Sequence, residues 1–208
     1  MYGFDEATGE GKGGSYIPAG ITENVTLKDI LYEPLKADGS GDDVLKFMFS
    51  DEHGASFTHI EFSIDPPKLK ELCKTWGKNN SETESYIKQQ FDAQGERIKH
   101  ILSCFIPKDK CVFRASNFQE FAEGVIKMVG DTYVNVPCRI KTVYKKNSQY
   151  TTFPNRAFKP FIQPMTQPNS LTIDPKWDIV EAVQPDSSGD VWESSETSTE
   201  SAEEQPAW

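Results

Sequence analysis

The segment VPCRIKTVYKKNSQYTTFPNRAFKPF, residues 136–161, combines positive charge with aromatic rings and contains no acidic residue. No Asp or Glu occurs between Asp131 and Asp174, although the whole chain has a formal net charge of −10. Cations can follow a phosphate backbone and rings can stack on bases, so this composition favours a surface that holds single-stranded nucleic acid. The alternative is a solvated hairpin with ordinary surface lysines and rings turned into a core. The cations are Arg139, Lys141, Lys145, Lys146, Arg156 and Lys159, and the rings are Tyr144, Tyr150, Phe153, Phe158 and Phe161.

The same segment predicts the last two strands of a sheet. Alternate positions from 134 to 142 are apolar or small and are expected to face the core, which turns Arg139, Lys141 and Lys145 outward. The polar residues 146–149 predict a turn. Residues 150–153 predict a returning strand, which Pro154 ends because proline cannot donate to a ladder.

Three further strands are predicted nearer the start of the chain. In residues 24–32 the apolar alternation slips by one position, which indicates a β-bulge. Residues 44–50 place three apolar side chains on one face. Residues 57–64 are expected to turn Ile60 and Phe62 inward, and therefore Phe57 and His59 outward.

Residues 65–130, between these two groups of strands, predict a helical block. Asp65 followed by Pro66 is typical of a helix start. The pairs Ser81 with Glu84 and Ser116 with Gln119 predict two capping boxes. The apolar stripes of these helices are expected to pack on the sheet.

Three strands, a helical block and two more strands are the element order of the OB-fold, a five-stranded barrel. The expected fold class is therefore mainly β with a helical insertion (α+β). The expected organisation is a flexible Gly-rich arm (1–19), an OB-fold-like nucleic-acid-binding domain (20–178) and a disordered acidic tail (179–208).

An OB-fold binds its ligand across the second and third strands, beside the loop between strands four and five. The sequence predicts that outward rings, cations and loop residues converge there. The candidate nucleic-acid-binding residues are Phe57, His59, Arg139, Lys141, Tyr144, Lys145, Lys146, Tyr150, Phe153, Arg156, Phe158 and Lys159.

Negative charge is concentrated at the end of the chain. From Glu181 to Trp208 there are eight acids and no Lys or Arg, and without them the chain has 24 acids against 22 cations. Such a composition predicts disorder. The terminal Trp208 is harder to explain as a solubility device, because a large ring is costly to leave in water.

With Glu203, Glu204 and Pro206 before the terminal Trp208, the chain resembles the single-stranded DNA-binding proteins of bacteria and bacteriophages. Those proteins join an OB-fold body to an acidic tail with an aromatic tip. The tail departs from the bacterial pattern in using Trp for Phe and in Gln205 and Ala207.

The resemblance implies a protein that binds and protects single-stranded DNA in replication, recombination and repair. It also implies that the tail competes with DNA for the groove and recruits partner proteins. The partner-binding residues would be Glu200, Glu203, Glu204, Pro206 and Trp208. Oligomeric state, including a homo-oligomer, and the choice between DNA and RNA stay open.

Two other functions are compatible with parts of the sequence. A metal-dependent nuclease could use Asp51, Glu52, His53, His59, Glu61 and Asp65, but no catalytic motif accompanies them. We therefore expect no catalytic residue, metal or cofactor. The other rival is a non-catalytic protein-interaction or virion-associated protein, in which the cations bind acids of another protein.

The sequence also predicts the compartment. Its four cysteines form no C-x-x-C pair, so free thiols are expected. No leader-like or membrane-spanning run is present in the printed sequence, and the expected location is the cytoplasm, that of the host if the protein is viral.

Overall fold

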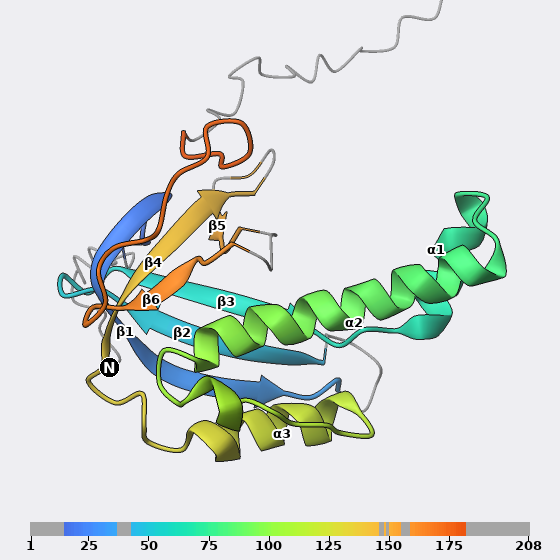
Figure 1. Cartoon of the computed structure of the whole chain (residues 1–208), viewed down its shortest axis with the longest axis horizontal. Helices are drawn as coiled ribbons and strands as arrows, with labels where there is room; N and C mark the ends of the chain where they lie inside the picture. Colours follow the sequence, from blue (N-terminus) through green and yellow to red (C-terminus); the bar gives the residue numbers. More distant parts are fainter. Residues whose placement is uncertain (1–14, 37–42, 146–147, 149, 155–158, 182–208) are drawn as a thin grey trace, which may run out of the picture.

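The structure is a computed structural model, and it describes residues 15–36, 43–145, 148, 150–154 and 159–181. These residues form an α+β fold with one six-stranded antiparallel sheet and three α-helices (Figure 1). The strands are β1 (Gly20–Glu33), β2 (Val44–Ser50), β3 (Ser56–Phe62), β4 (Pro137–Tyr144), β5 (Thr151–Thr152) and β6 (Ile162–Pro164). The helices are α1 (Pro66–Thr75), α2 (Asn80–Leu102) and α3 (Phe118–Val129), with a 3-10 turn η1 (Lys108–Lys110).

The strands are arranged in the order β3-β2-β1-β4-β5, and β6 pairs with β4. The predicted succession of three strands, helices and two strands is confirmed, but the predicted closed barrel is wrong. β5 contacts β3, yet no ladder of the described residues joins them, so the sheet stays open. The sequence also missed β6, because the prolines around it weaken the strand pattern.

β1 connects the two halves of the sheet. Its first half pairs with β4 and its second half with β2, and the register shifts between Leu27 and Asp29, where the alternation slips. The predicted bulge is therefore confirmed. A second irregularity lies between Thr22 and Val25, where Asn24 has a positive φ of 56°. These two shifts let one strand bend across the sheet.

The faces of β3 are the reverse of those predicted. Phe57, His59 and Glu61 point into the core, while Ile60 and Phe62 are exposed. The register with β2 explains the reversal, because Phe49 lies opposite Phe57 and Phe47 opposite His59. Side chains of directly opposed residues share a face, so Phe57 and His59 follow the phenylalanines of β2 inward.

The helices begin close to the predicted positions. Asp65 caps α1 by accepting a hydrogen bond from Lys68 N, as expected. The two boxes are displaced, however: Asn79 with Glu82 caps α2, and Asn117 caps α3. Asparagine is as good an N-cap as serine, and here it stands at the position that precedes the apolar stripe.

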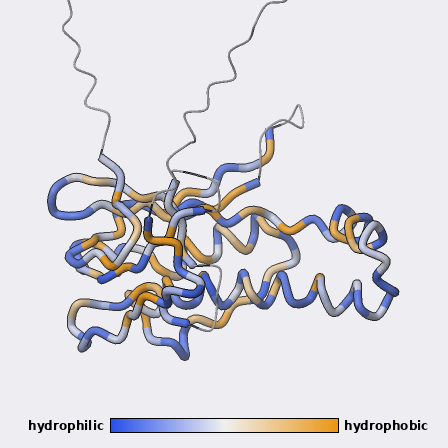
Figure 2. Tube along the Cα trace, turned by 90° about the horizontal axis from the view of Figure 1, so that it is seen from above, coloured by the Kyte–Doolittle hydropathy of each residue, from blue (hydrophilic) through white to orange (hydrophobic). Residues whose placement is uncertain are grey.

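The helical block shares its core with the sheet. Ile98, Ile101 and Leu102 from the end of α2 and Val125 from α3 pack in the cluster that contains Phe47. The start of α2, together with α1, forms a hairpin that projects to one side of the body (Figures 1 and 2). We call this projection the α1–α2 arm.

The folded region begins before residue 20, within the segment predicted as an arm. Ile17 is fully buried, and its N–H donates to Ser56 O at 2.9 Å. Residues 1–14 and the predicted tail beyond residue 181 lie outside the described residues. Among the helices of the described part, none has the length and apolar character needed to traverse a bilayer.

Candidate nucleic-acid interface

A cleft of about 350 Å³ lies between β3 and the connection from β4 to β5. Its floor includes Ser56, Thr58 and Ile60 of β3. Two rings line it, and both face solvent: Tyr16 is 72% exposed and Tyr150 is 59% exposed. Exposed rings beside a cleft provide the surfaces on which bases can stack. We call this space the tyrosine cleft.

Backbone hydrogen bonds hold both rings in place. Ser56 N donates to Ser15 O at 2.8 Å, and together with the bond from Ile17 N this fixes Tyr16 beside β3. On the opposite wall, Lys145 N donates to Tyr150 O at 3.0 Å. Thr151 Oγ1 donates to Ile17 O at 3.2 Å and so ties the two walls together. The backbone that carries the two tyrosines is therefore held by hydrogen bonds within the protein.

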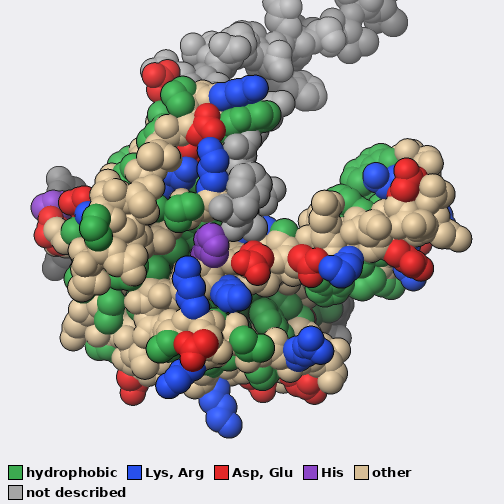
Figure 3. All heavy atoms as spheres, viewed as in Figure 1, with side chains coloured by type: hydrophobic (Ala, Val, Ile, Leu, Met, Phe, Trp, Pro, Cys, Tyr) green, Lys and Arg blue, Asp and Glu red, His purple; other side chains and the backbone are tan. Residues whose placement is uncertain are grey.

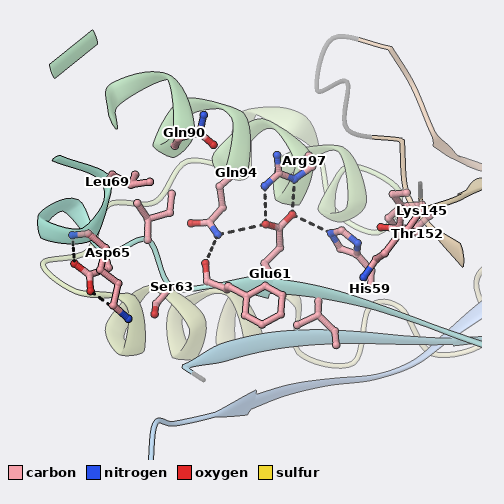
Figure 4. Close-up of a pocket in the computed structure, with 15 residues that line it drawn as sticks. His59, Glu61, Ser63, Asp65, Leu69, Gln90, Gln94, Arg97, Lys145 and Thr152 are labelled. Atoms are coloured by element: carbon pink, nitrogen blue, oxygen red, sulfur yellow. Dashed lines mark hydrogen bonds and ion pairs between the residues drawn. The ribbon is translucent and has the colours of Figure 1, made fainter. Parts of the chain in front are cut away.

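A second cavity of about 540 Å³ continues from the tyrosine cleft toward the α1–α2 arm (Figure 4). The two spaces share Ile60 and Lys145 in their linings, so they lie next to each other, and we call them together the groove. The arm contributes Lys68 and Leu69 from α1 and a row of polar residues from α2, including Gln90. We call this space the arm cavity.

A buried charge network forms one wall of the arm cavity. Glu61 accepts hydrogen bonds from Arg97 Nε at 2.6 Å and Arg97 Nη2 at 2.8 Å, and it contacts His59 Nε2 at 2.9 Å (Figure 4). Gln94 Nε2 adds a longer bond of 3.3 Å. Burial alone would raise the carboxyl pKa, but the hydrogen bonds from Arg97 and His59 outweigh it and lower the pKa of Glu61 to about 2.

This network fastens α2 to β3 and supplies no free cation for a ligand. The Glu61 carboxylate neutralises the charge of Arg97, and the hydrogen bond from Arg97 to Glu61 raises the pKa of the guanidinium. His59 Nδ1 is buried and has no hydrogen-bond partner among the described residues. His59 was predicted to contact nucleic acid, and that prediction is wrong because its ring is enclosed.

The rings predicted to stack on bases are mostly core residues. Phe57 and Phe153 are almost fully buried, with ring centroids 4.9 Å apart. Phe153 also lies 4.9 Å from His59 and 4.5 Å from Phe161. This cluster closes the space between β3 and the β4–β5 hairpin. The cluster supports the walls of the cleft from the core side. The prediction that Phe57 and Phe153 face the ligand is therefore wrong.

Two of the predicted cations are also buried. Arg139 Nε donates to Glu23 Oε1 at 2.7 Å, and Lys141 Nζ donates to Asp178 Oδ2 at 2.9 Å. β4 pairs with β1 along one edge and with β6 along the other, and its residues from Cys138 to Val143 are buried on both faces. The expectation that Arg139 and Lys141 face solvent is therefore wrong.

Residues 165–181, which we call the strap, provide much of this cover. The strap runs alongside β4 (Figure 1) and supplies both Asp178 and Thr172, whose carbonyl accepts a second bond from Lys141 Nζ at 3.0 Å. It also supplies Asp174, which pairs with the half-exposed Lys159 at 3.0 Å. Three of the six predicted cations are thus neutralised within the protein.

Six predicted residues line the groove, and three of them are buried in its walls: Phe57, His59 and Phe153. Of the others, Tyr144 is partly buried and lines the tyrosine cleft, Tyr150 is exposed there, and Lys145 is exposed and lines both spaces. Three others, Lys146, Arg156 and Phe158, lie outside the described residues. The same holds for the tail residues Glu200, Glu203, Glu204, Pro206 and Trp208.

Sequence reasoning missed several residues that shape the groove. Tyr16 was assigned to an arm, and only its position beside Ser56 brings it to the cleft. Ile60 and Phe62 were assigned to the core, yet Phe62 is 49% exposed. With Met48 of β2 they form an exposed apolar strip on the outer face of the sheet.

Charge on the visible surface is mixed. In the space-filling view, Lys and Arg side chains are interspersed with Asp and Glu, and the α1–α2 arm stands apart from the body (Figure 3). The residues weighed as a metal site do not converge. His53 is exposed in a turn, 3.8 Å from Glu52, and within the described ranges no three His, Cys, Asp or Glu side chains are grouped as metal ligands.

Comparison with known proteins identified no relative. No protein-family model, curated protein sequence or solved structure matched this chain.

Proposed function

We propose that this protein binds single-stranded nucleic acid in the groove formed by the tyrosine cleft and the arm cavity. Tyr16 and Tyr150 stack on bases, and Lys145 contacts a phosphate between them. The observation that carries the proposal is the placement of two exposed rings and one exposed lysine on opposite walls of a single cleft. Stacking on a ring tolerates any base, so the binding would depend little on sequence.

The fold supports this proposal at a coarse level. The element order and the contact between β5 and β3 fit an opened relative of the OB-fold, whose ligand groove follows the same strands. Together with the acidic tail, this arrangement resembles the single-stranded DNA-binding proteins of bacteria and bacteriophages. On that basis we propose DNA as the ligand and replication, recombination and repair as the context, in the cytoplasm.

The position of the strap favours regulation by the tail. Tyr144 N donates to Ile179 O at 2.7 Å, so the strap ends beside a residue that lines the tyrosine cleft. Residues 182–208 follow directly and contain seven acids. In this proposal the tail competes with DNA for the groove, and bound DNA releases the tip, ending at Trp208, to recruit partner proteins. Because coupling is reciprocal, a partner that holds the tail raises the affinity for DNA.

The proposal is tested by fluorescence anisotropy of labelled oligothymidylate with the full chain and two variants of Tyr150. Tyr150→Ala removes a stacking surface worth about 1–3 kcal/mol, so the dissociation constant should rise by about 5- to 150-fold. Tyr150→Phe keeps the ring and should bind nearly as well as the unaltered chain. Equal affinities for all three proteins, or no binding to any oligonucleotide, would contradict the proposal.

One observation favours a different function. Ile60, Phe62 and Met48 expose apolar surface beside the cleft, while three of the six expected cations are neutralised internally. A non-catalytic protein-interaction or virion-associated protein would use this apolar strip to bind another protein. Failure of the folded chain to bind single-stranded DNA or RNA at low salt would favour that alternative.

A further inference from the structure

The α1–α2 arm carries positive charge that nucleic-acid binding at the cleft does not use. Between Pro66 and Asn80 there are four lysines (Lys68, Lys70, Lys74 and Lys78) and one acid, Glu71. The only ion pair recorded for these lysines in the described chain joins Lys68 to Asp65 at 3.8 Å, and both partners are solvated. Such a pair contributes little, so the lysines present almost their full charge to solvent.

A large ring is exposed at the end of α1. Trp76 is 52% exposed and packs edge-on against Tyr86 of α2, with ring centroids 5.6 Å apart at 84°. Lys78 lies over the Tyr86 ring at 5.8 Å. Leu72, one turn before Trp76, is also exposed. The arm thus combines cations with a partly uncovered indole, the two features that single-stranded nucleic acid requires of a surface.

The arm is continuous with the proposed groove. Lys68 and Leu69 already line the arm cavity (Figure 4). Positions 68, 72 and 76 are four residues apart, so they follow one another along the same side of the helix. From Lys68 to Thr75, where α1 ends, the helix extends the track by about 10 Å at a rise of 1.5 Å per residue. A strand leaving the cavity past Lys68 would therefore meet Leu72 and then Trp76.

We propose that α1 is a second contact region for single-stranded nucleic acid, in which Trp76 stacks on a base and the lysines bind phosphates. This inference rests on the function proposed above and extends its groove. An acidic peptide such as the tail could also satisfy the lysines. Nucleic acid is favoured because the arm continues a groove that already holds two exposed tyrosines.

The test uses Trp76 as an internal reporter. The chain has four tryptophans, and replacing Trp177, Trp192 and Trp208 with Phe in the full-length protein leaves Trp76 as the sole indole. Labelled oligothymidylates of about 4 to about 30 nucleotides span the range of one OB-type site and beyond. Short oligomers should bind, by anisotropy, without changing Trp76 emission. Longer oligomers should quench that emission and bind more tightly.

A charge variant provides a second readout. Lys78 lies just beyond Trp76, so Lys78→Gln should reduce the slope of log affinity against log salt by about 0.7 for long oligomers, because each phosphate contact on a single strand contributes about 0.7. The slope for short oligomers should not change. The matched control, Lys127→Gln, removes an exposed lysine elsewhere and should leave both slopes unaltered.

The outcomes separate this inference from the function on which it rests. If oligomers of every length bind without affecting Trp76 emission, and Lys78→Gln leaves the salt slope unaltered, α1 is not a contact region, although the cleft still binds. If no oligomer binds, both proposals fail. If Trp76 emission responds only to removal of residues 182–208, the arm holds the tail instead and the inference is overturned.

Discussion

Lys141 and Asp178 form an ion pair with an N–O distance of 2.9 Å, and their side chains are only 2% and 4% exposed. The pair joins the centre of β4 to the strap near the start of the acidic tail. Asp178 also accepts a bond from Asp174 N at 2.8 Å, which stabilises the bend of the strap. A lysine that composition assigns to DNA binding is therefore a structural residue that fastens the last described segment to the sheet.

Replacing Lys141 with Met should destabilise the fold rather than weaken DNA binding alone. The change leaves the Asp178 carboxylate buried without its cation, and breaking a buried pair in this way costs about 3–5 kcal/mol. Urea denaturation followed by circular dichroism measures the loss. Lys159→Met serves as the control, because its pair with Asp174 is half-exposed and should contribute at most about 1 kcal/mol. A Lys141→Met protein of unaltered stability would show that the strap is not fastened by this pair.

The Glu61 network should make stability depend on pH in the acid range. The folded-state pKa of Glu61 is about 2, below its ordinary value of 4.5, so ionised Glu61 favours the folded state. This stabilisation is complete above pH 4.5 and is lost as the pH falls from 4.5 toward 2. It amounts to about 3 kcal/mol by linkage.

The variant Glu61→Gln isolates this contribution. It should lower the free energy of unfolding at neutral pH, because Arg97 then loses its carboxylate partner. It should also flatten the stability profile between pH 4.5 and 2 relative to the unaltered protein, as measured by urea midpoints at several pH values. If the stability of the two proteins depended equally on pH between 4.5 and 2, groups other than Glu61 would cause the acid sensitivity.

Local patterns predicted the elements well. The alternation of β2 gave its bounds to the residue, and the phase slip located the bulge of β1, since both depend on neighbouring residues alone. The exposure of Lys145 and Tyr150 was predicted for the same reason. They flank the predicted turn, and both side chains are exposed.

Long-range pairing decided the rest and could not be read from periodicity. Both rows of β3 contain apolar residues, and the row with Glu61 enters the core because it lies opposite the phenylalanines of β2. Arg97, 36 residues further along the chain, neutralises Glu61 there. Arg139 donates a hydrogen bond to Glu23, which lies 116 residues earlier in the chain. Tyr16 reaches the cleft because β3 offers a backbone bridge at Ser56. The sequence shows the charges, but their partners depend on the tertiary fold.

Internal neutralisation should halve the salt dependence of DNA binding. If all six cations of residues 136–161 met phosphates, log affinity would fall against log salt with a slope of about −4. Arg139, Lys141 and Lys159 are paired within the protein, and phosphate contacts by the other three cations of the segment, Lys145, Lys146 and Arg156, would give a slope of about −2. Anisotropy titrations of a short oligothymidylate at several salt concentrations provide the slope.

Lys145→Gln should reduce that slope by about 0.7, and Lys110→Gln, away from both parts of the groove, should not affect it. A slope near −4 for the unaltered chain would mean that Arg139, Lys141 and Lys159 reach phosphates. The strap would then have to leave β4 when DNA binds.

Removing residues 182–208 should tighten DNA binding. The segment carries seven acids and follows the strap, in which Ile179 O accepts a hydrogen bond from Tyr144 N, so we expect a high effective concentration of the tail at the groove. Its loss removes a competitor, and at low salt the affinity for oligothymidylate should rise by roughly 10-fold, or about 1.4 kcal/mol. The gain should vanish at high salt, where the tail is screened.

A full-length variant with the seven acids changed to Asn or Gln distinguishes charge from bulk. It should bind as tightly as the truncated protein if competition is electrostatic, whereas Trp208→Ala should bind like the unaltered chain because it keeps every acid. Unchanged affinity after truncation at low salt would rule out competition. The acidic residues would then act only in binding partner proteins. Recruitment of those partners by the tip would not depend on whether DNA occupies the groove.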